Sequence, residues 1–121
     1  MNLTTEVILE STTYGTASGN YDGSSQDFFS NPGRAADYYA GQGSIQTVGI
    51  QVTDFLGRIK IYATLNEYPG PGPWFELYDY DHSLLPITDY HPVSFTGSYV
   101  WIRAEITNFD AGTINSINIM Y

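Results

Sequence analysis

The chain of 121 residues contains no cysteine, which excludes disulfide bonds, cysteine-ligated zinc and thiol nucleophiles. Basic residues are also scarce. Only 4 lysines and arginines stand against 13 acids, which gives a formal net charge of −9. A surface this acidic repels phosphate backbones and anionic lipids, so we expect neither a nucleic-acid partner nor a membrane partner.

Long apolar runs are missing from the chain as well. No stretch approaches the roughly 20 apolar residues that a membrane-spanning helix needs. The N-terminal sequence MNLTTEVILESTT has neither the basic start nor the continuous apolar segment of a signal peptide. No stretch is rich in leucine and alanine at helical spacing. We therefore expect a soluble protein without helices.

The chain has instead a composition that favours strands. Apolar residues make up 42% of it, which is enough for a core, and its length is that of a single domain, 1–121. Aromatic residues account for 16%, and 11 of them are tyrosines. Tyrosine and threonine fit half-buried pleated surfaces. The composition predicts an all-β domain.

Alternating apolar and polar residues mark strands in the centre and at the end of the chain. Residues 45–55 (IQTVGIQVTDF) and 58–65 (RIKIYATL) alternate with period two, and the short Leu-Gly link between them predicts a hairpin. Residues 98–107 and 113–121 repeat the pattern around a turn. Such strands predict an antiparallel β-sandwich, jelly-roll-like. The residues expected to face its core are Val48, Ile50, Val52, Ile59, Ile61, Ala63, Leu65, Val100, Ile102, Ala104, Ile106, Ile117, Ile119 and Tyr121.

Residues 14–44 are rich in glycine, serine, asparagine and aspartate, with aromatic pairs at 28–29 and 38–39. Because these aromatic side chains need burial, we expect loops around short strands in this loop-rich range. The same range could also serve as an arm that becomes ordered only on assembly.

The stretch 66–83, NEYPGPGPWFELYDYDHS, combines prolines, aromatic residues and acids. Its prolines are expected to stiffen the connection that follows the strand 58–65. Acids and histidines continue to residue 91, and the set comprises Asp79, Asp81, His82, Asp89 and His91. The two histidines lie nine residues apart with Pro86 between them, so no ligand spacing places them together. We expect no bound metal and no cofactor.

No catalytic motif accompanies these residues. The chain has neither a G-x-S-x-G elbow nor a G-x-x-x-x-G-K-[ST] phosphate loop, and the histidines have no recognisable catalytic partner. Thirteen acids on a small protein guarantee pairs of carboxylates, so such pairs do not indicate a glycosidase. We expect a protein that is not an enzyme.

The aromatic residues of this stretch indicate a contact surface instead. The candidate contact or ligand surface comprises Tyr68, Trp74, Tyr78, Asp79 and Tyr80. Its rings could stack on sugars while Asp79 accepts hydrogen bonds from hydroxyls. The rings could equally anchor a protein partner, because tyrosine and tryptophan bury large areas at low entropy cost. Trp74 and Trp101 are expected to be structural, filling a core or a subunit interface.

Three segments carry a resemblance to a known group of proteins. They are residues 37–65 (DYYAGQGSIQTVGIQVTDFLGRIKIYATL), 73–77 (PWFEL) and 95–121 (FTGSYVWIRAEITNFDAGTINSINIMY). The group is marked by a tyrosine pair before a glycine, a V-T-F-G-I-I-TL segment, a Trp-Phe pair and a closing F-T-G-Y-V-W-I-R-A strand followed by F-AGTI-I. Over residues 21–121 the chain resembles small all-β proteins of marine tailed phages, cyanophages especially. It departs from them in the proline-rich segment 68–73.

The resemblance implies a virion protein: a head decoration, neck, tail or fibre-associated subunit whose partners are other virion proteins. A small all-β protein with few lysines and exposed aromatic residues also suits docking onto a symmetric lattice or a closed homo-oligomer. We therefore expect a non-catalytic structural protein. The alternative is a carbohydrate-binding adhesion module on the particle surface, with a host-surface glycan as its ligand.

Overall fold

Seven strands form one antiparallel sheet in the computed structural model, which describes residues 5–35, 45–70 and 73–121. The strands are β1 (Thr5–Leu9), β2 (Thr12–Thr13), β3 (Phe28–Phe29), β4 (Gly33–Arg34), β5 (Ile45–Thr64), β6 (Phe75–Thr96) and β7 (Trp101–Met120). The predicted all-β antiparallel class is confirmed. Among the described residues, no helix is long and apolar enough to cross a membrane.

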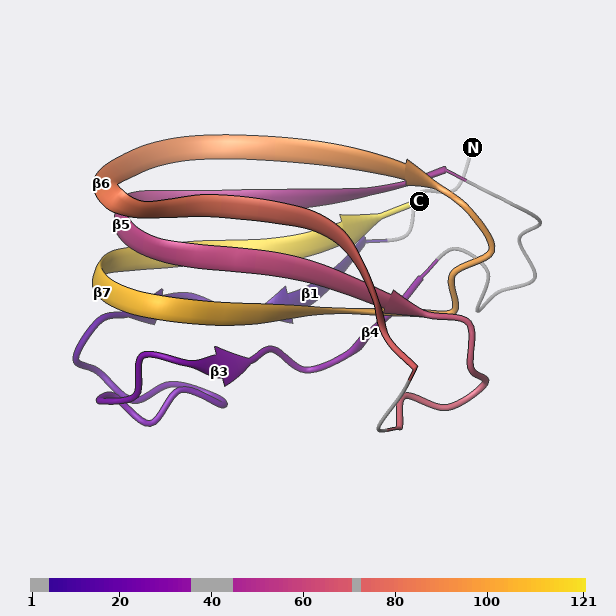
Figure 1. Cartoon of the computed structure of the whole chain (residues 1–121), viewed down its shortest axis with the longest axis horizontal. Helices are drawn as coiled ribbons and strands as arrows, with labels where there is room; N and C mark the ends of the chain where they lie inside the picture. The colour runs from indigo at the N-terminus through magenta and orange to yellow at the C-terminus, as the bar shows by residue number, and fades with distance from the viewer. Residues whose placement is uncertain (1–4, 36–44, 71–72) are drawn as a thin grey trace.

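Each of the three long strands bends near its middle, so that the sheet folds over into two layers (Figure 1). We call the layer nearer the viewer the front layer (58–64, 75–82 and 101–107) and the other the back layer (45–53, 88–96 and 113–120). In both layers β5 lies between β6 and β7. β3 and β4 extend the front layer beside β7, whereas β1 and β2 extend the back layer. This order is consistent with the predicted jelly-roll-like sandwich.

The hairpin predicted around Leu56 and Gly57 is wrong. Residues 45–55 and 58–64 belong to one strand, and each segment pairs with β6 and β7 rather than with the other. The turn predicted in 108–112 is likewise a bend within β7. An alternating run interrupted by a glycine fits both a hairpin and a bent strand, so the local pattern alone could not separate them.

The bends of β5 and β7 contain residues with left-handed backbone conformation, and at these bends two segments of the chain approach each other closely. Asp54 in β5 has a φ of 50°, and Asn108 and Gly112 in β7 have φ values of 53° and 85°. A Cβ atom on Gly112 would lie 2.1 Å from the carbonyl oxygen of Asp54. Only glycine fits there, because any other residue would combine an unfavourable φ with a backbone clash.

The core lies between the two layers, and the period-two pattern identified it correctly. The predicted residues of β5 and β7 that are fully or almost fully buried are Val48, Ile50, Val52, Ile59, Ile61, Ala63, Ile102, Ala104, Ile106, Ile117 and Ile119. Tyr121 packs on this core while partly buried. Leu65 is the clear exception, being 56% exposed just beyond the end of β5.

Aromatic rings fill the core at the bend. Phe109 contacts Tyr14, Tyr21, Phe28 and Phe55, with centroid distances from 5.2 to 6.1 Å. Tyr21 and Phe28 come from the loop-rich range 14–44, so its described part packs on the domain as loops and short strands. Residues 36–44 of that range, which include the second aromatic pair, lie outside the described residues.

Candidate functional site

The five residues predicted to form a contact surface do not converge on one surface. Tyr68 is 74% exposed in the connection after β5. Asp79 points outward from the front layer, where it pairs with Arg58. Tyr78 and Tyr80 point inward, because their neighbours on β5 are the buried Ile61 and Ile59.

Both tryptophans fix the connection between β5 and β6. Trp101 Nε1 donates a hydrogen bond to the carbonyl of Glu67 at 3.0 Å, and Trp74 Nε1 donates to the carbonyl of Gly70 at 2.8 Å. The Arg103 guanidinium lies 4.3 Å from the ring centroids of both Trp74 and Phe29. A cation over an aromatic face is attracted by the ring quadrupole. One face of Trp74 is therefore already occupied within the chain.

Asp79 belongs to a network of charges on the outside of the front layer. Arg58 holds it with two hydrogen bonds, one of them from Nε to Oδ1 at 2.7 Å. These bonds lower the pKa of Asp79 and raise the pKa of Arg58. Beside them, Lys60 Nζ lies 3.4 Å from Glu76 Oε1. The network joins β5 to β6 and leaves Asp79 engaged rather than free for a ligand.

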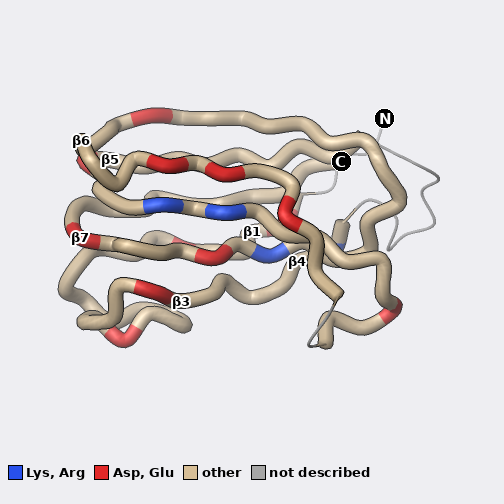
Figure 2. Tube along the Cα trace, in the orientation of Figure 1, with Lys and Arg blue, Asp and Glu red and all other residues tan. Residues whose placement is uncertain are grey.

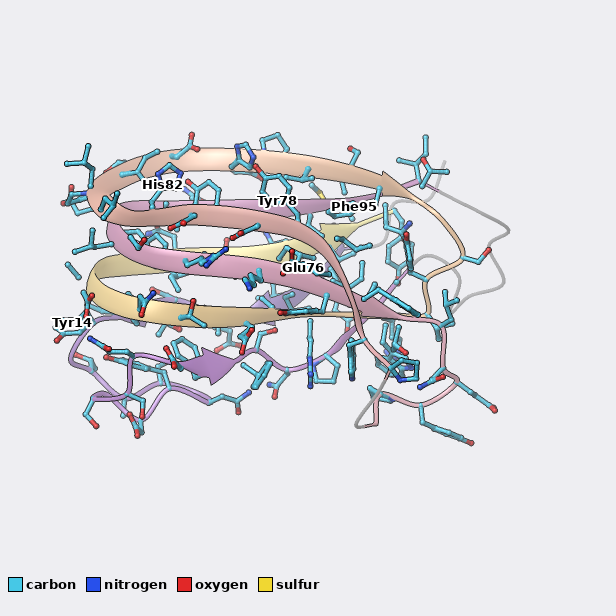
Figure 3. The ribbon with its side chains drawn as sticks, in the orientation of Figure 1. Tyr14, Glu76, Tyr78, His82 and Phe95 are labelled. Carbon is cyan, nitrogen blue, oxygen red and sulfur yellow. The ribbon has the colours of Figure 1, made fainter. Side chains whose placement is uncertain are left out.

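A partly buried polar cluster lies where β6 folds back on itself. Tyr78 OH and His91 Nε2 are 2.7 Å apart, and Tyr80 OH donates to Asp89 Oδ2 at 3.1 Å. His91 Nδ1 lies 3.8 Å from the same Asp89 oxygen. Figure 3 shows Tyr78 between the two passes of β6. The bend thus brings together groups that are 9 to 13 residues apart in the chain.

The surroundings of Tyr80 favour its neutral, protonated hydroxyl. Tyr80 is 3% exposed, and burial, followed by the neighbouring Asp89 carboxylate, raises the pKa of its hydroxyl. The rings of Tyr78 and Tyr80 pack on His91 with centroid distances of 5.4 and 5.1 Å. The buried Tyr80 hydroxyl has its hydrogen-bond partner in Asp89, as buried polar groups generally do, whereas the His91 and Asp89 side chains are 34% and 35% exposed. Such a cluster joins the two passes of β6, and its polar groups are already engaged with one another.

The histidines and acids also do not assemble a metal site in the part of the chain that the structure describes. No group of three or more histidine, aspartate or glutamate residues there could hold an ion. Asp81 accepts hydrogen bonds from the Ser83 hydroxyl at 2.7 Å and from its backbone amide at 3.1 Å, which lower its pKa. This is the geometry of a local turn, and the carboxylate supports the β6 bend.

Sequence reasoning missed two exposed surfaces. At the β6 bend Leu84 is 91% exposed and Leu85 76%, and both border a small hollow that His82 also lines. Two successive leucines before a proline in a polar stretch were an available signal. The second surface is the outer face of the back layer, where Tyr90 is 54% exposed. Its signal was the scarcity of charge in the three segments 45–53, 88–96 and 113–120, which contain one charged residue, Asp89.

Comparison with known proteins gives no assignment. No protein-family model matches the chain, and no curated protein is significantly similar to it.

Proposed function

We propose that the chain is a non-catalytic structural protein of a tailed-phage particle that acts through protein–protein contacts. The resemblance over residues 21–121 supports the particle, and the geometry supports the mode of action. The observation that carries the proposal is that the candidate polar side chains form hydrogen bonds with one another. Tyr78 is hydrogen-bonded to His91 and Tyr80 to Asp89, and Asp79 is held by Arg58.

Catalysis and small-ligand binding need polar groups that converge on an accessible cleft. Here the polar groups that converge are paired with one another, as Tyr78 with His91 and Tyr80 with Asp89. The two layers also present broad sheet faces to the solvent (Figure 1). Broad sheet faces of this kind suit a macromolecular partner better than a small substrate. The proposed activity is therefore assembly.

The alternative is a carbohydrate-binding adhesion module, and few of the predicted aromatic rings are available to stack on a sugar. Trp74 has one ring face covered by Arg103, and Tyr78 and Tyr80 point inward. Tyr68 is the member of the predicted surface whose ring is widely exposed. If the module binds glycans, a glycan array will give saturable signals that Tyr68→Ala abolishes without a change in melting temperature.

Mass spectrometry of purified particles of the encoding phage tests the main proposal. We expect the protein in many copies per particle, retained after density-gradient purification and nuclease treatment. A protein made in infected cells but lost from purified particles would contradict a structural role in the virion. Saturable glycan binding that requires Tyr68 would favour the adhesion module instead.

A further inference from the structure

The outer face of the back layer is free of charge, in contrast to the rest of the molecule. The back-layer segments 45–53, 88–96 and 113–120 contain a single aspartate, glutamate, lysine or arginine, which is Asp89. Its side chain points inward to Tyr80. Most outward positions, which also include Gly49, Pro92 and Met120, are hydroxyl, amide and aromatic residues: Thr47, Gln51, Tyr90, Ser94, Ser116 and Asn118. We call this surface the uncharged face.

The front layer, which is built from the same three strands, has many more charged residues than the back layer. Its segments 58–64, 75–82 and 101–107 contain seven charged residues. Figure 2 shows these charges along the strands of the front layer. Both layers turn alternate residues to the solvent, so exposure alone does not explain the difference. The asymmetry distinguishes one face of a protein whose net charge is −9.

The uncharged face also carries apolar groups suited to an interface. Tyr90 is 54% exposed and Val7, on the neighbouring β1, is 52% exposed. A Cβ atom on Gly49 would contact the Tyr90 ring at 3.4 to 3.8 Å, so this ring rests on the sheet beside it. A tyrosine held against a flat surface loses little entropy on binding. Exposed tyrosines of this kind are typical interface anchors.

The chemistry of the face favours a second copy of the same chain as its occupant. Hydroxyl and amide side chains each donate and accept hydrogen bonds, so a surface made of them complements itself under a twofold axis. Two molecules of charge −9 repel each other wherever their acids meet. The uncharged face is the approach that minimises this repulsion. A basic partner would instead be drawn to the acidic loops.

The area is sufficient for a reversible contact. Three segments of eight or nine residues and the five residues of β1 cover roughly 500 Å² on each copy. Two such faces together remove about 1,000 Å² from solvent, which is the size of a weak, reversible interface.

We propose that the uncharged face is a homotypic interface through which two copies of the chain associate back layer to back layer. This inference rests on the proposed structural function and names its partner surface. The front faces, with their charges, then point away from each other on the two sides of the pair.

Sedimentation equilibrium of the intact protein across a concentration series tests the interface. The wild type is expected to associate reversibly, and more strongly as salt is added, because salt screens the repulsion between two acidic molecules. A monomer at every concentration and salt level would overturn the inference. So would an association that weakens with salt, since that would indicate a contact between opposite charges.

A pair of substitutions at Gln51 separates this face from the effect of net charge. Gln51 is exposed in the middle of the face, between Tyr90 and Ser116, and Gln51→Glu is nearly isosteric. Both Gln51→Glu and Gln51→Lys are expected to weaken self-association at least about tenfold, because each buries a charge at the contact. If only net charge matters, Gln51→Lys will strengthen association while Gln51→Glu weakens it, and the inference fails.

Ala17→Glu is the control, since it adds the same negative charge at an exposed position of the loop that precedes Tyr21. It should leave association nearly unchanged. Circular dichroism melts of all three variants would verify that the fold is intact.

Two measurements keep this inference apart from the proposed function. A protein that is monomeric in solution but abundant in purified particles overturns the interface and leaves the virion role standing. A protein that pairs through the uncharged face but is absent from particles does the reverse. If Gln51 variants lose binding to a glycan or to another virion protein while all forms stay monomeric, the face belongs to that partner and the second-copy assignment is wrong.

Discussion

Asp79 and Tyr80 are neighbours in sequence, yet the pleat sends them to opposite sides of the sheet and gives them opposite electrostatic surroundings. Asp79 faces outward to Arg58, whose hydrogen bonds favour the ionised carboxylate. Tyr80 faces inward, where burial and Asp89 favour the neutral hydroxyl. Two adjacent residues of β6 thus serve different roles, one in a charged surface pair and the other as a buried neutral group.

The Asp79–Arg58 pair predicts a measurable dependence of stability on acid. The folded pKa of Asp79 lies below its ordinary value of 3.8, so its stabilising contribution is present above that value and is lost as the pH falls below it. Asp79→Asn is expected to lower stability at neutral pH by about 1 kcal/mol or less, as for exposed ion pairs. In thermal melts at pH values from neutral to below 3.8, Asp79→Asn should lose less stability through the acid range than the wild type. An identical acid slope in both proteins would contradict this role.

The buried isoleucines provide a test of the core at single-residue resolution. Ile50, Ile61 and Ile102 each have 0% exposure. Replacement of any one by alanine is expected to cost about 2–5 kcal/mol, from lost burial and the cavity that remains. Ile45, which is 64% exposed at the start of β5, is the matched control and should tolerate alanine at little cost. Urea titrations would measure these differences, and similar small effects at all four positions would mean that the core is assigned wrongly.

At the scale of strands, the bends depend on a few positions of unusual backbone. Gly112→Ala is expected to destabilise the protein by more than about 2 kcal/mol, because its φ of 85° and its contact with Asp54 both exclude a Cβ atom. Gly15→Ala is the matched control: its φ is 88°, but nothing lies within 4 Å of the added atom. It carries the conformational cost alone, about 1 kcal/mol. Equal losses in denaturant titrations would show that the close approach at the β7 bend is unimportant.

The sequence predicted the faces of the strands far better than their connections. The alternation of Val48, Ile50 and Val52 follows from burial on one side of a pleat, which is a local rule. Whether Leu56-Gly57 reverses the chain or bends it depends on β6 and β7, which pair with both sides of the bend. Nothing within a few residues of that link carries this information.

The dependence on distant strands also explains why the contacts of the candidate site could not be predicted from the sequence. Tyr78, Tyr80, Asp89 and His91 were all prominent in the sequence, but their pairing requires the fold of β6. Because the sequence does not show that bend, it offered no recognisable partner for His91. The uncharged face was missed for a related reason, since it is assembled from three segments that each look ordinary alone.

At the scale of the whole molecule, the two layers share their strands and should therefore unfold together. β5, β6 and β7 each contribute residues to both layers, so melting one layer removes the ends that hold the other. We expect far-ultraviolet circular dichroism and near-ultraviolet aromatic signals to report one coincident transition in urea. A transition in two steps, with aromatic packing lost first, would show that the layers are independent.

The continuous strands also determine how the protein would carry mechanical load. In a sandwich of two separate sheets, a pull on one sheet reaches the other through side-chain packing and loops, and the sheets can slide. Here a pull on the uncharged face passes along the covalent backbone of β5, β6 and β7 to the front layer. The domain would then resist shear between its layers until the backbone of the bends straightens.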